Sequence, residues 1–416
     1  MKIALACVLL AAACTPEIDA YKPLDVKAAR DLDILFVIDD SSNRGSYDEM
    51  ASQLDVLQAR LADVDGQLPS LHVGVVTTDL GTSSTKDALP GWTTGNCTGF
   101  GKAGQLQTFD GQPGGGYLED LRDASGGRMR NFTSNDLAGE LDRLTNPSNL
   151  GIGCEYEQPL EAMRKALDPE INPGFMRDGA LLSVVFLTAE DDCSAQRSAV
   201  MDPTNTTLGA PTHFRCTSQG VICDPDDPWR EGDHANCRPR EGSPVMVDVS
   251  EYKTFLEAAK PDKRDVVVSA VAGSRDTFKV RNVGSPVLQP SCTGPGGTAY
   301  PAVRIGSLVD SFGGAFVDAC TQESAYQRIT KPLLDRQRSC LPSLLASERE
   351  GCTVLEIVGD TETELTECAT GAAGPCWYSY ADAAACPDGD NLGIAVRRGA
   401  GVAPSGARLE ARCFVP

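Results

Sequence analysis

The sequence predicts an α/β protein built on a doubly wound, mostly parallel sheet, with a disulfide-rich insertion and a small β-rich C-terminal module. From about residue 30 to residue 343, continuous apolar runs alternate with segments whose apolar residues repeat at helical spacing. A cysteine-containing stretch without periodicity interrupts this pattern, and short alternating segments replace it after residue 343. Such alternation is typical of a parallel sheet covered by helices.

The predicted strands are apolar runs without alternation, a pattern that indicates strands buried on both faces. They span residues 34–38, 71–77, 180–187, 265–272 and 315–319.

The predicted helices lie between these runs, and their apolar residues repeat every three or four positions. They span residues 50–61, 137–144 and 156–167. Pro301 is well placed to begin another helix, and Gly313 is well placed to end it. A last helix is expected from about residue 324 towards residue 340, with a kink or break at Pro332.

The N-terminal end is typical of an exported protein. Lys2 precedes an apolar segment, residues 3–13, which is shorter than the roughly 20 residues of a membrane-spanning helix. The small residues before Cys14 resemble a bacterial lipobox, although Ala11 replaces the preferred leucine. The resemblance implies a signal peptide at 1–13, a lipid on Cys14, a tether at 14–29 and an outer-membrane location. An ordinary signal peptide, with Cys14 paired or incidental, is the alternative.

The chain is strongly acidic, with a formal net charge of −21. This charge and the absence of a Lys/Arg-rich run exclude nucleic-acid binding and electrostatic adhesion to anionic lipid. We therefore expect membrane contact through the lipid anchor alone, and partners that are cationic, metal ions among them.

The cysteines indicate a disulfide framework formed in an oxidising compartment. The chain has 16 cysteines, and fourteen remain once Cys7 and Cys14 are set aside. Eight belong to the α/β domain and its insertion at 190–247, and six to the module at 344–416 and its approach; the pairing stays open. Zinc binding by His213 and His234 is less favoured because no CxxC motif is present. The candidates are Cys97, Cys154, Cys193, Cys216, Cys223, Cys237, Cys292 and Cys320, then Cys340, Cys352, Cys368, Cys376, Cys386 and Cys413.

Oxygen-bearing side chains follow two of the predicted strands. Ligands of an open parallel sheet gather at the carboxyl ends of the strands flanking the point where strand order reverses. Carboxylate and hydroxyl oxygens meeting there would suit Mg²⁺ or Ca²⁺; solvated acids in polar loops are the alternative. The side chains are Asp39, Asp40, Ser41 and Asn43 after the first strand, and Thr188, Glu190, Asp191 and Asp192 after the strand at 180–187.

The motif Asp39-x-Ser41-x-Asn43 after an apolar strand, with the order of elements above, resembles the von Willebrand factor type A domain. More narrowly, the chain is similar to cysteine-rich envelope lipoproteins with that domain in myxobacteria and their relatives. The phrases LHVGVVTTDLG at 71–81, GIGCEYEQPLEAM at 151–163 and VVFLTAEDDCS at 184–194 support this. The similarity covers about 30–343, and PCWY at 375–378 resembles the module that follows.

The resemblance implies a metal-ion-dependent adhesion site at Asp39 and Ser41, with Asn43 in place of a serine. The family's central-loop threonine has no counterpart, because Ile152 and Gly153 occupy that region. Ala189 stands where a later aspartate is usual, and Glu190 or Asp191 would substitute as outer ligands.

The sequence favours a lipid-anchored binding or adhesion protein that presents this domain to a protein or surface partner. A metal-free structural scaffold of the envelope is the alternative. An enzyme is not expected, because no phosphate-binding loop, nucleophile elbow or nucleophile–base pair is apparent.

Overall fold

The computed structural model describes most of the α/β domain and parts of the C-terminal module. Cys14, Asn43, His213 and Cys386, together with the expected signal peptide, lie outside the described residues. The described residues are 22–26, 31–42, 54–61, 68–108, 116–122, 127–134, 136–212, 214–224, 230–261, 263–294, 297–321, 325–337, 339–340, 352–358, 360–369, 375–381, 392–397 and 408–413.

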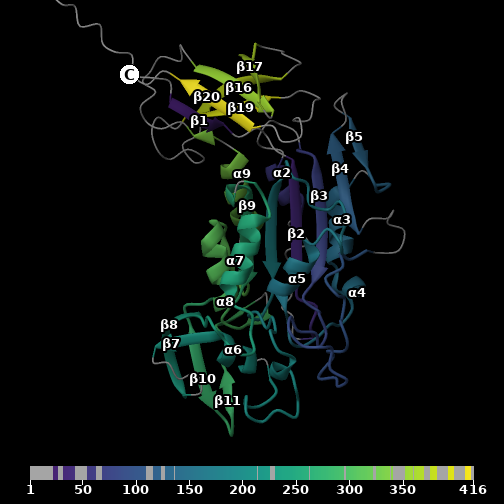
Figure 1. Cartoon of the computed structure of the whole chain (residues 1–416), viewed down its shortest axis with the longest axis vertical. Helices are drawn as coiled ribbons and strands as arrows, with labels where there is room; N and C mark the ends of the chain where they lie inside the picture. The colour runs from purple at the N-terminus through teal and green to yellow at the C-terminus, as the bar shows by residue number, and fades with distance from the viewer. Residues whose placement is uncertain are drawn as a thin grey trace, which may run out of the picture.

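The main sheet has the doubly wound, largely parallel architecture that the sequence predicts (Figure 1). Its order is β14, β9, β6, β2, β3, β4, β5. The first five strands in that order are parallel, and β4 and β5 add an antiparallel edge. Their bounds are β2 Leu32–Ile38, β3 Leu71–Thr77, β4 Tyr117–Arg122, β5 Arg128–Arg130, β6 Leu181–Leu187, β9 Val266–Ala272 and β14 Phe316–Asp318. The edge strands β4 and β5 were not anticipated.

Helices cover both faces of this sheet, which explains why every residue of β2, β3, β6 and β9 is buried. On one face, Ile34 and Phe36 pack with α2 Leu54–Leu61, α3 Leu137–Thr145 and α9 Ala325–Gln337. On the other, Leu35 and Val37 pack with α5 Pro159–Ala166, α7 Val249–Ala258 and α8 Val303–Phe312. The short helix α4, Pro147–Leu150, follows α3.

Two helix predictions can be compared closely with the structure. Gly313 ends α8 in the left-handed conformation, with φ of 61°, as expected of a C-terminal glycine. Of the kink or break expected at Pro332, the break is wrong, because α9 runs through that residue. The stripe of Tyr326, Ile329 and Leu333 is buried in the core, and this packing holds the helix together across the proline.

The insertion forms its own small sheet, and that sheet extends beyond the expected boundary at residue 247. Strands β10 and β11, which follow β9 in the chain, complete the order β11, β10, β8, β7. Phe278 and Val280 of β10 share a core with Val221 and Cys223. The remaining elements of the α/β domain and its insertion are η1 Ser198–Val200, α6 Phe214–Gly220, β7 Val221–Asp224, β8 Gly232–Pro239, η2 Lys263–Asp265, β10 Phe278–Asn282, β11 Pro286–Leu288, β12 Cys292–Gly294 and β13 Gly297–Ala299.

The C-terminal module is a seven-stranded sheet in the order β1, β20, β16, β17, β18, β19, β15. Residues 22–26, expected to belong to a tether, instead form β1 and pair antiparallel with β20. The module is therefore assembled from both ends of the chain. Its strands are β1 Lys22–Val26, β15 Ser339–Cys340, β16 Cys352–Val358, β17 Thr361–Glu367, β18 Cys376–Ala381, β19 Leu392–Arg397 and β20 Arg408–Cys413.

Each disulfide whose two cysteines are both described joins members of one of the two groups predicted from the sequence. The α/β domain and its insertion contain Cys97–Cys154, Cys193–Cys216, Cys223–Cys237 and Cys292–Cys320. The module contains Cys368–Cys376, and Cys352 is also in a disulfide.

The module and the insertion lie at opposite ends of the main sheet (Figure 1). Because β6 runs directly into the insertion, the carboxyl ends of the parallel strands face the insertion and their amino ends face the module. Among the residues that the structure describes, no helix has the length and apolar composition needed to cross a membrane.

Candidate functional site

The carboxyl ends of β2 and β6 lie side by side, at the point where the order of the strands reverses. Ile38 is in register with Leu187, the last residues of the two strands. The chain then continues as Asp39, Asp40 and Ser41 on one strand and Thr188, Ala189 and Glu190 on the other. We call the surrounding loops, residues 39–42, 78–104, 150–158 and 188–192, the strand-end face. This is where an open parallel sheet places its ligands.

Asp39 connects the two strand ends and is fully buried. Its backbone N–H donates to the carbonyl of Leu187 over 2.9 Å. One carboxylate oxygen accepts a hydrogen bond from the N–H of Ser41 at 2.9 Å, and the other accepts one from the N–H of Ala189 at 3.3 Å. The carboxylate is thus fixed between the loops that follow β2 and β6.

Glu157 and Glu190 bring two more buried carboxyl groups to the same place. Glu157 is 1% exposed and Glu190 is 4% exposed. Burial, followed by the nearby charge of Asp39, raises the pKa of Glu190 to about 8. Burial and the charges of Glu190 and Asp39 also raise the pKa of Glu157 well above its usual value. The two glutamates are hydrogen-bonded to each other, so the pair holds a proton at neutral pH.

The Ser41 hydroxyl is also part of the cluster. The Ser41 hydroxyl lies beside the Glu157 carboxyl, yet it makes no hydrogen bond of normal geometry within the described structure. The hydroxyls of Thr77 and Thr78, at the end of the adjacent strand β3, also have no such partner there. Buried polar atoms usually have partners, and of these three oxygens the Ser41 hydroxyl is the one that lies beside a carboxyl group of the cluster.

Asp40 is neutralised by an internal cation. The Lys102 ammonium donates to one Asp40 carboxylate oxygen, and it also donates to the carbonyl of Leu150 over 2.6 Å. Burial raises the pKa of Asp40 to about 6, while the Lys102 charge opposes that rise. A Cβ atom on Gly153 would lie 2.4 Å from an Asp40 carboxylate oxygen, so this close approach requires glycine.

Asp191, which was expected to be an outer metal ligand, instead accepts hydrogen bonds from the backbone of a helix. Its carboxylate accepts hydrogen bonds from the backbone N–H groups of Arg304, at 3.0 and 3.1 Å, and of Ile305, at 3.2 Å. It therefore caps the first turn of α8. Asp192 next to it is ion-paired with Arg304 at 3.0 Å, with both side chains fully buried. We leave both aspartates out of the candidate site.

The donor set suits a hard cation held by few direct ligands. Within the described residues, the ligand atoms of Cys292, Asp318 and Cys320 form a trio within 4.8 Å of one another, whereas Asp39, Glu157 and Glu190 form no such trio. Because Cys292 and Cys320 are joined in a disulfide, their trio is not a metal site. Mg²⁺ commonly takes one or two carboxylates and keeps several waters. Asp39 and the orphaned Ser41 hydroxyl fit direct contact, and the glutamates fit contact through water.

Glu157 is the site residue that sequence reasoning missed. It follows Ile152 and Gly153, which occupy the region where the type A resemblance implies a threonine. Ile152 is 66% exposed and points away from any buried site. The sequence feature that points to Glu157 is its position two residues before the proline that begins α5. The segment before that helix must pass the carboxyl ends of the sheet's strands.

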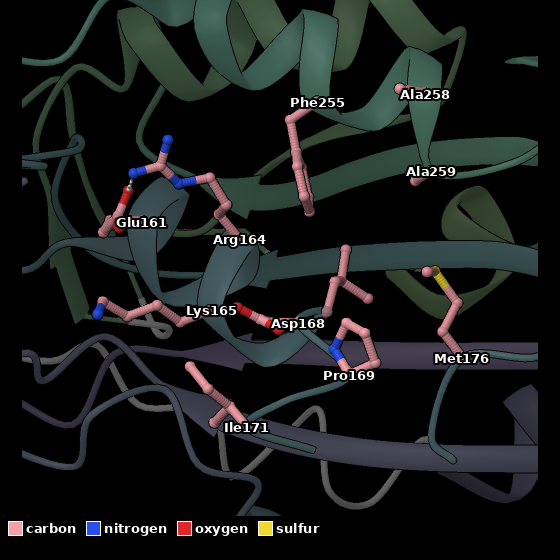
Figure 2. A pocket seen from close by; sticks show the side chains of 11 residues that line it. Glu161, Arg164, Lys165, Asp168, Pro169, Ile171, Met176, Phe255, Ala258 and Ala259 are labelled. Carbon is pink, nitrogen blue, oxygen red and sulfur yellow. Dashed lines mark ion pairs between the residues drawn. The ribbon is translucent and has the colours of Figure 1, made fainter. Parts of the chain in front are cut away.

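A separate hollow of about 580 Å³ lies between α5, the loop that follows it and α7 (Figure 2). Its lining is mostly apolar, and includes Met176 and Phe255. Glu161 and Arg164, on its border, are paired with each other at 2.6 Å, and the Arg164 guanidinium lies 5.4 Å from the centre of the Tyr252 ring. These groups do not converge on the hollow, so we assign no site to it.

Comparisons with known proteins do not assign a family or a function to this chain. No protein-family model matches the chain, and no curated protein matches it. An aerotolerance-related membrane protein from Bacteroides fragilis aligns over 72% of this chain and 97% of its own, with 10% identity and a TM-score of 0.27. BatB, a conserved hypothetical protein from Bacteroides thetaiotaomicron, aligns over 72% and 98%, with 11% identity and a TM-score of 0.26.

The human COPII-coat protein Sec24c aligns over 94% of this chain and 39% of its own, with 11% identity and a TM-score of 0.25. TM-scores this low do not establish a shared fold. The doubly wound architecture of this chain therefore rests on its own strand order and register.

Proposed function

We propose that this chain is a lipid-anchored protein of the bacterial cell envelope, and that its type A-like domain binds a protein or surface partner through the strand-end face. A divalent cation, Mg²⁺ or Ca²⁺, bound near Asp39 and Ser41, would organise that face. The role is binding rather than catalysis. Among the described residues of the face, no histidine accompanies the acids, and Cys97 and Cys154 are joined in a disulfide.

One observation supports this proposal above the others: the buried Glu157 carboxyl lies among groups of its own sign, beside a serine hydroxyl without a normal hydrogen bond. Burying like charges together costs several kcal/mol unless a proton or a cation compensates them. Carboxylate and hydroxyl oxygens at the switch point of a parallel sheet are suited to a hard cation.

The residues have separate parts in this proposal. Asp39, fixed between two strand ends, and Ser41 would contact the ion. Glu157 and Glu190 would hold its water ligands and set its charge balance. The bound ion would supply positive charge to an otherwise acidic face. Since all four side chains are almost fully buried, the ion would act chiefly by fixing the loops that a partner contacts.

A metal-free scaffold is the second candidate, and two contacts favour it. Lys102 already compensates Asp40. Glu157 and Glu190 can share a proton in place of a cation. In that case the strand-end acids would be stabilised without any ion, and the domain would serve as a disulfide-braced structural element of the envelope.

Thermal unfolding with and without divalent cations separates the two candidates. With a cation well above its dissociation constant, we expect Mg²⁺ or Mn²⁺ to raise the melting temperature of the full chain by a few degrees over EDTA. Asp39→Asn should abolish this response. Asp310→Asn, which alters an exposed ion pair with Arg275, is the matched control and should keep it. If these ions do not change the melting temperature of the wild-type protein, the metal-free scaffold is the remaining candidate.

A further inference from the structure

A carboxylate lies against one disulfide of the α/β domain. Asp318 is the last residue of β14, Cys320 follows it two positions later, and Cys292 is the first residue of β12. The Sγ atom of Cys292 lies 3.1 Å from a carboxylate oxygen of Asp318. The ligand atoms of the three residues all lie within 4.8 Å of one another. We call Cys292, Asp318 and Cys320 the β14 trio.

The contact between Asp318 and Cys292 suits a thiol better than a disulfide. A disulfide sulfur carries no proton, so it cannot donate a hydrogen bond to the carboxylate. A thiol in the same place would donate its S–H to that oxygen. The carboxylate charge also disfavours the thiolate, which is the form that attacks another sulfur to close a disulfide. The surroundings of Cys292 therefore stabilise the reduced pair more than the disulfide.

The backbone holds the trio together independently of the disulfide bond. β14 is paired in parallel with β9 in the main sheet. The N–H of Tyr300, which follows β13, donates to the carbonyl of Ala189 over 2.8 Å, and so fixes the β12–β13 hairpin on the loop after β6. A Cβ on Gly294 would lie 2.6 Å from the backbone carbonyl oxygen of Cys320, so the hairpin packs closely on the segment after β14. The two sulfurs would therefore stay neighbours after reduction.

Two thiolates and one carboxylate are a ligand set that suits Zn²⁺. In a tetrahedral site with Zn–S bonds of about 2.3 Å, the two sulfurs lie about 3.8 Å apart. The Cα atoms of Cys292 and Cys320 are 6.0 Å apart, so rotation of the side chains can provide that separation. Cys292 and Asp318 are half-buried, which lets a water take the fourth position. The N–H of Cys320 donates to the Asp318 carboxylate over 2.8 Å and orients it.

We propose that reduction of the Cys292–Cys320 disulfide turns the β14 trio into a binding site for Zn²⁺, with the two sulfurs and the Asp318 carboxylate as its protein ligands. In the oxidised chain the trio binds no metal. The inference goes beyond the proposed function and rests on neither the strand-end cation nor a partner. Metal binding at the trio would follow the redox state of the envelope.

A dithiol supplies the two electrons that the reduction requires. One of its thiolates attacks a sulfur of the disulfide, and its second thiol then closes the dithiol's own disulfide. The half-buried Cys292 is the sulfur of the pair that an external thiolate can reach. The net change moves two hydrogen atoms from the dithiol to Cys292 and Cys320. Zn²⁺ then displaces one proton from each thiol, so each bound ion releases two protons.

A redox titration of the full chain tests the reduction step. The native protein is equilibrated without oxygen at rising ratios of reduced to oxidised dithiothreitol, and its free cysteines are alkylated and mapped by mass spectrometry. Cys223–Cys237 is the matched control: Cys237 is also half-buried, and among the described residues no metal-ligating trio includes that pair. The thiol–carboxylate hydrogen bond should open Cys292–Cys320 at a ratio about tenfold lower or more. Opening together with the control, or after it, would overturn the proposal.

A metal titration then tests the site itself. The chain is taken at the ratio that opens Cys292–Cys320 alone, freed of dithiothreitol, and titrated with Cd²⁺, a thiolate-binding substitute for Zn²⁺. We expect one ion per chain, the ultraviolet absorption of cadmium–thiolate bonds, two protons released per ion, and displacement by Zn²⁺. The oxidised chain should show none of this absorption. A reduced chain that lacks it, or an oxidised chain that has it, would overturn the proposal.

Asp318→Asn tests the carboxylate without removing the acceptor of the Cys320 N–H. It should weaken Cd²⁺ binding by about tenfold or more, since a neutral amide replaces a charged ligand. Asp310→Asn, on the exposed ion pair with Arg275, is the matched control and should bind Cd²⁺ as wild type does. Equal affinity of Asp318→Asn and wild type would overturn the trio. If Asp318→Asn does not fold, the wild-type titration decides alone.

The strand-end cation is tested separately. Asp39→Asn, which should abolish the melting-temperature response to Mg²⁺, should leave Cd²⁺ binding by the reduced chain unchanged. Failure of the Mg²⁺ response therefore affects the proposed function alone, and failure of the Cd²⁺ titration affects this inference alone.

Discussion

The two ends of strand β2 hold buried aspartates in opposite surroundings. Asp33, near the amino end, pairs with Arg177 at 2.8 Å and lies 3.5 Å from the Lys260 ammonium. Asp39, at the carboxyl end, lies near the carboxyl groups of Glu157 and Glu190. Both aspartates are fully buried. The charge of a buried acid beside two cations is compensated within the fold, whereas buried acids gathered together require a proton or a bound ion.

This contrast coincides with the two ends of the molecule. The amino ends of the strands face the module that contains β1, and the carboxyl ends face the insertion (Figure 1). In our proposal the first end is near the membrane and the second presents the binding face. The charge arrangement then separates a structural end from a functional one.

The largest expected effect concerns the anchor at the structural end. Cys14→Ala should release an otherwise folded, oxidised protein from the membrane fraction, because the lipid is the proposed membrane contact. Fractionation followed by immunoblotting measures the release. A variant that remains in the membrane fraction would show that the lipid anchor is wrong.

The next effect concerns Asp33, the buried aspartate that lies beside two cations. Besides its pairing with Asp33, Arg177 donates to the carbonyls of Leu32 and Ser70 at 2.8 and 3.1 Å. Arg177→Met should lower the free energy of unfolding by about 3 kcal/mol or more, since it leaves a buried charge poorly paired. The control Arg197→Met removes an exposed pair with Asp87 and should cost below about 1 kcal/mol. Denaturant titration compares them; equal losses would refute the contrast.

The effect that is smallest at any one step of pH is the dependence of stability on pH, which should have opposite signs at the two ends. The pKa of Glu190 is raised from 4.5 to about 8, so the folded chain binds the proton more tightly than the unfolded chain. Stability should therefore fall between about pH 4.5 and 8, by at most about 1.4 kcal/mol per pH unit for one proton. Glu190→Gln should flatten this slope when unfolding is measured in EDTA.

His72, at the amino end, should act in the other direction. Burial lowers its pKa below 6.5 in the folded chain, so the unfolded chain binds the proton first as the pH falls. Stability should decline below about pH 6.5, and Glu190→Gln should leave that decline unchanged. A Glu190→Gln profile identical to that of wild type throughout would argue against the buried glutamate pair.

The central sheet could be predicted because its signal is local. Strands such as Leu181–Leu187 are buried on both faces and therefore appear as unbroken apolar runs. The edge strand Tyr117–Arg122 could not be found in this way, since it contains Glu119 and Asp120. Asp120 is buried through its ion pairs with Arg128 and Arg130, which no apolar pattern reveals.

Non-local pairing explains the other misses. Strand β1 pairs with β20 from the far end of the chain, and β10 joins a sheet that begins in the insertion. Asp39 and Ser41 could be named from their motif. Glu157 could not, because only the folded chain brings the start of α5 against the ends of β2 and β6.

Calorimetric titration of the full chain with Mn²⁺ tests the central claim most directly: the strand-end acids form a cation site, and the amino-end acids do not. We predict one ion per chain for the wild type and no binding for Asp39→Asn. Glu157→Gln should weaken the affinity about tenfold, as loss of a group that holds the ion's water ligands does. A wild-type protein that binds no Mn²⁺, or a Glu157→Gln variant that binds it as tightly as wild type, would contradict this account.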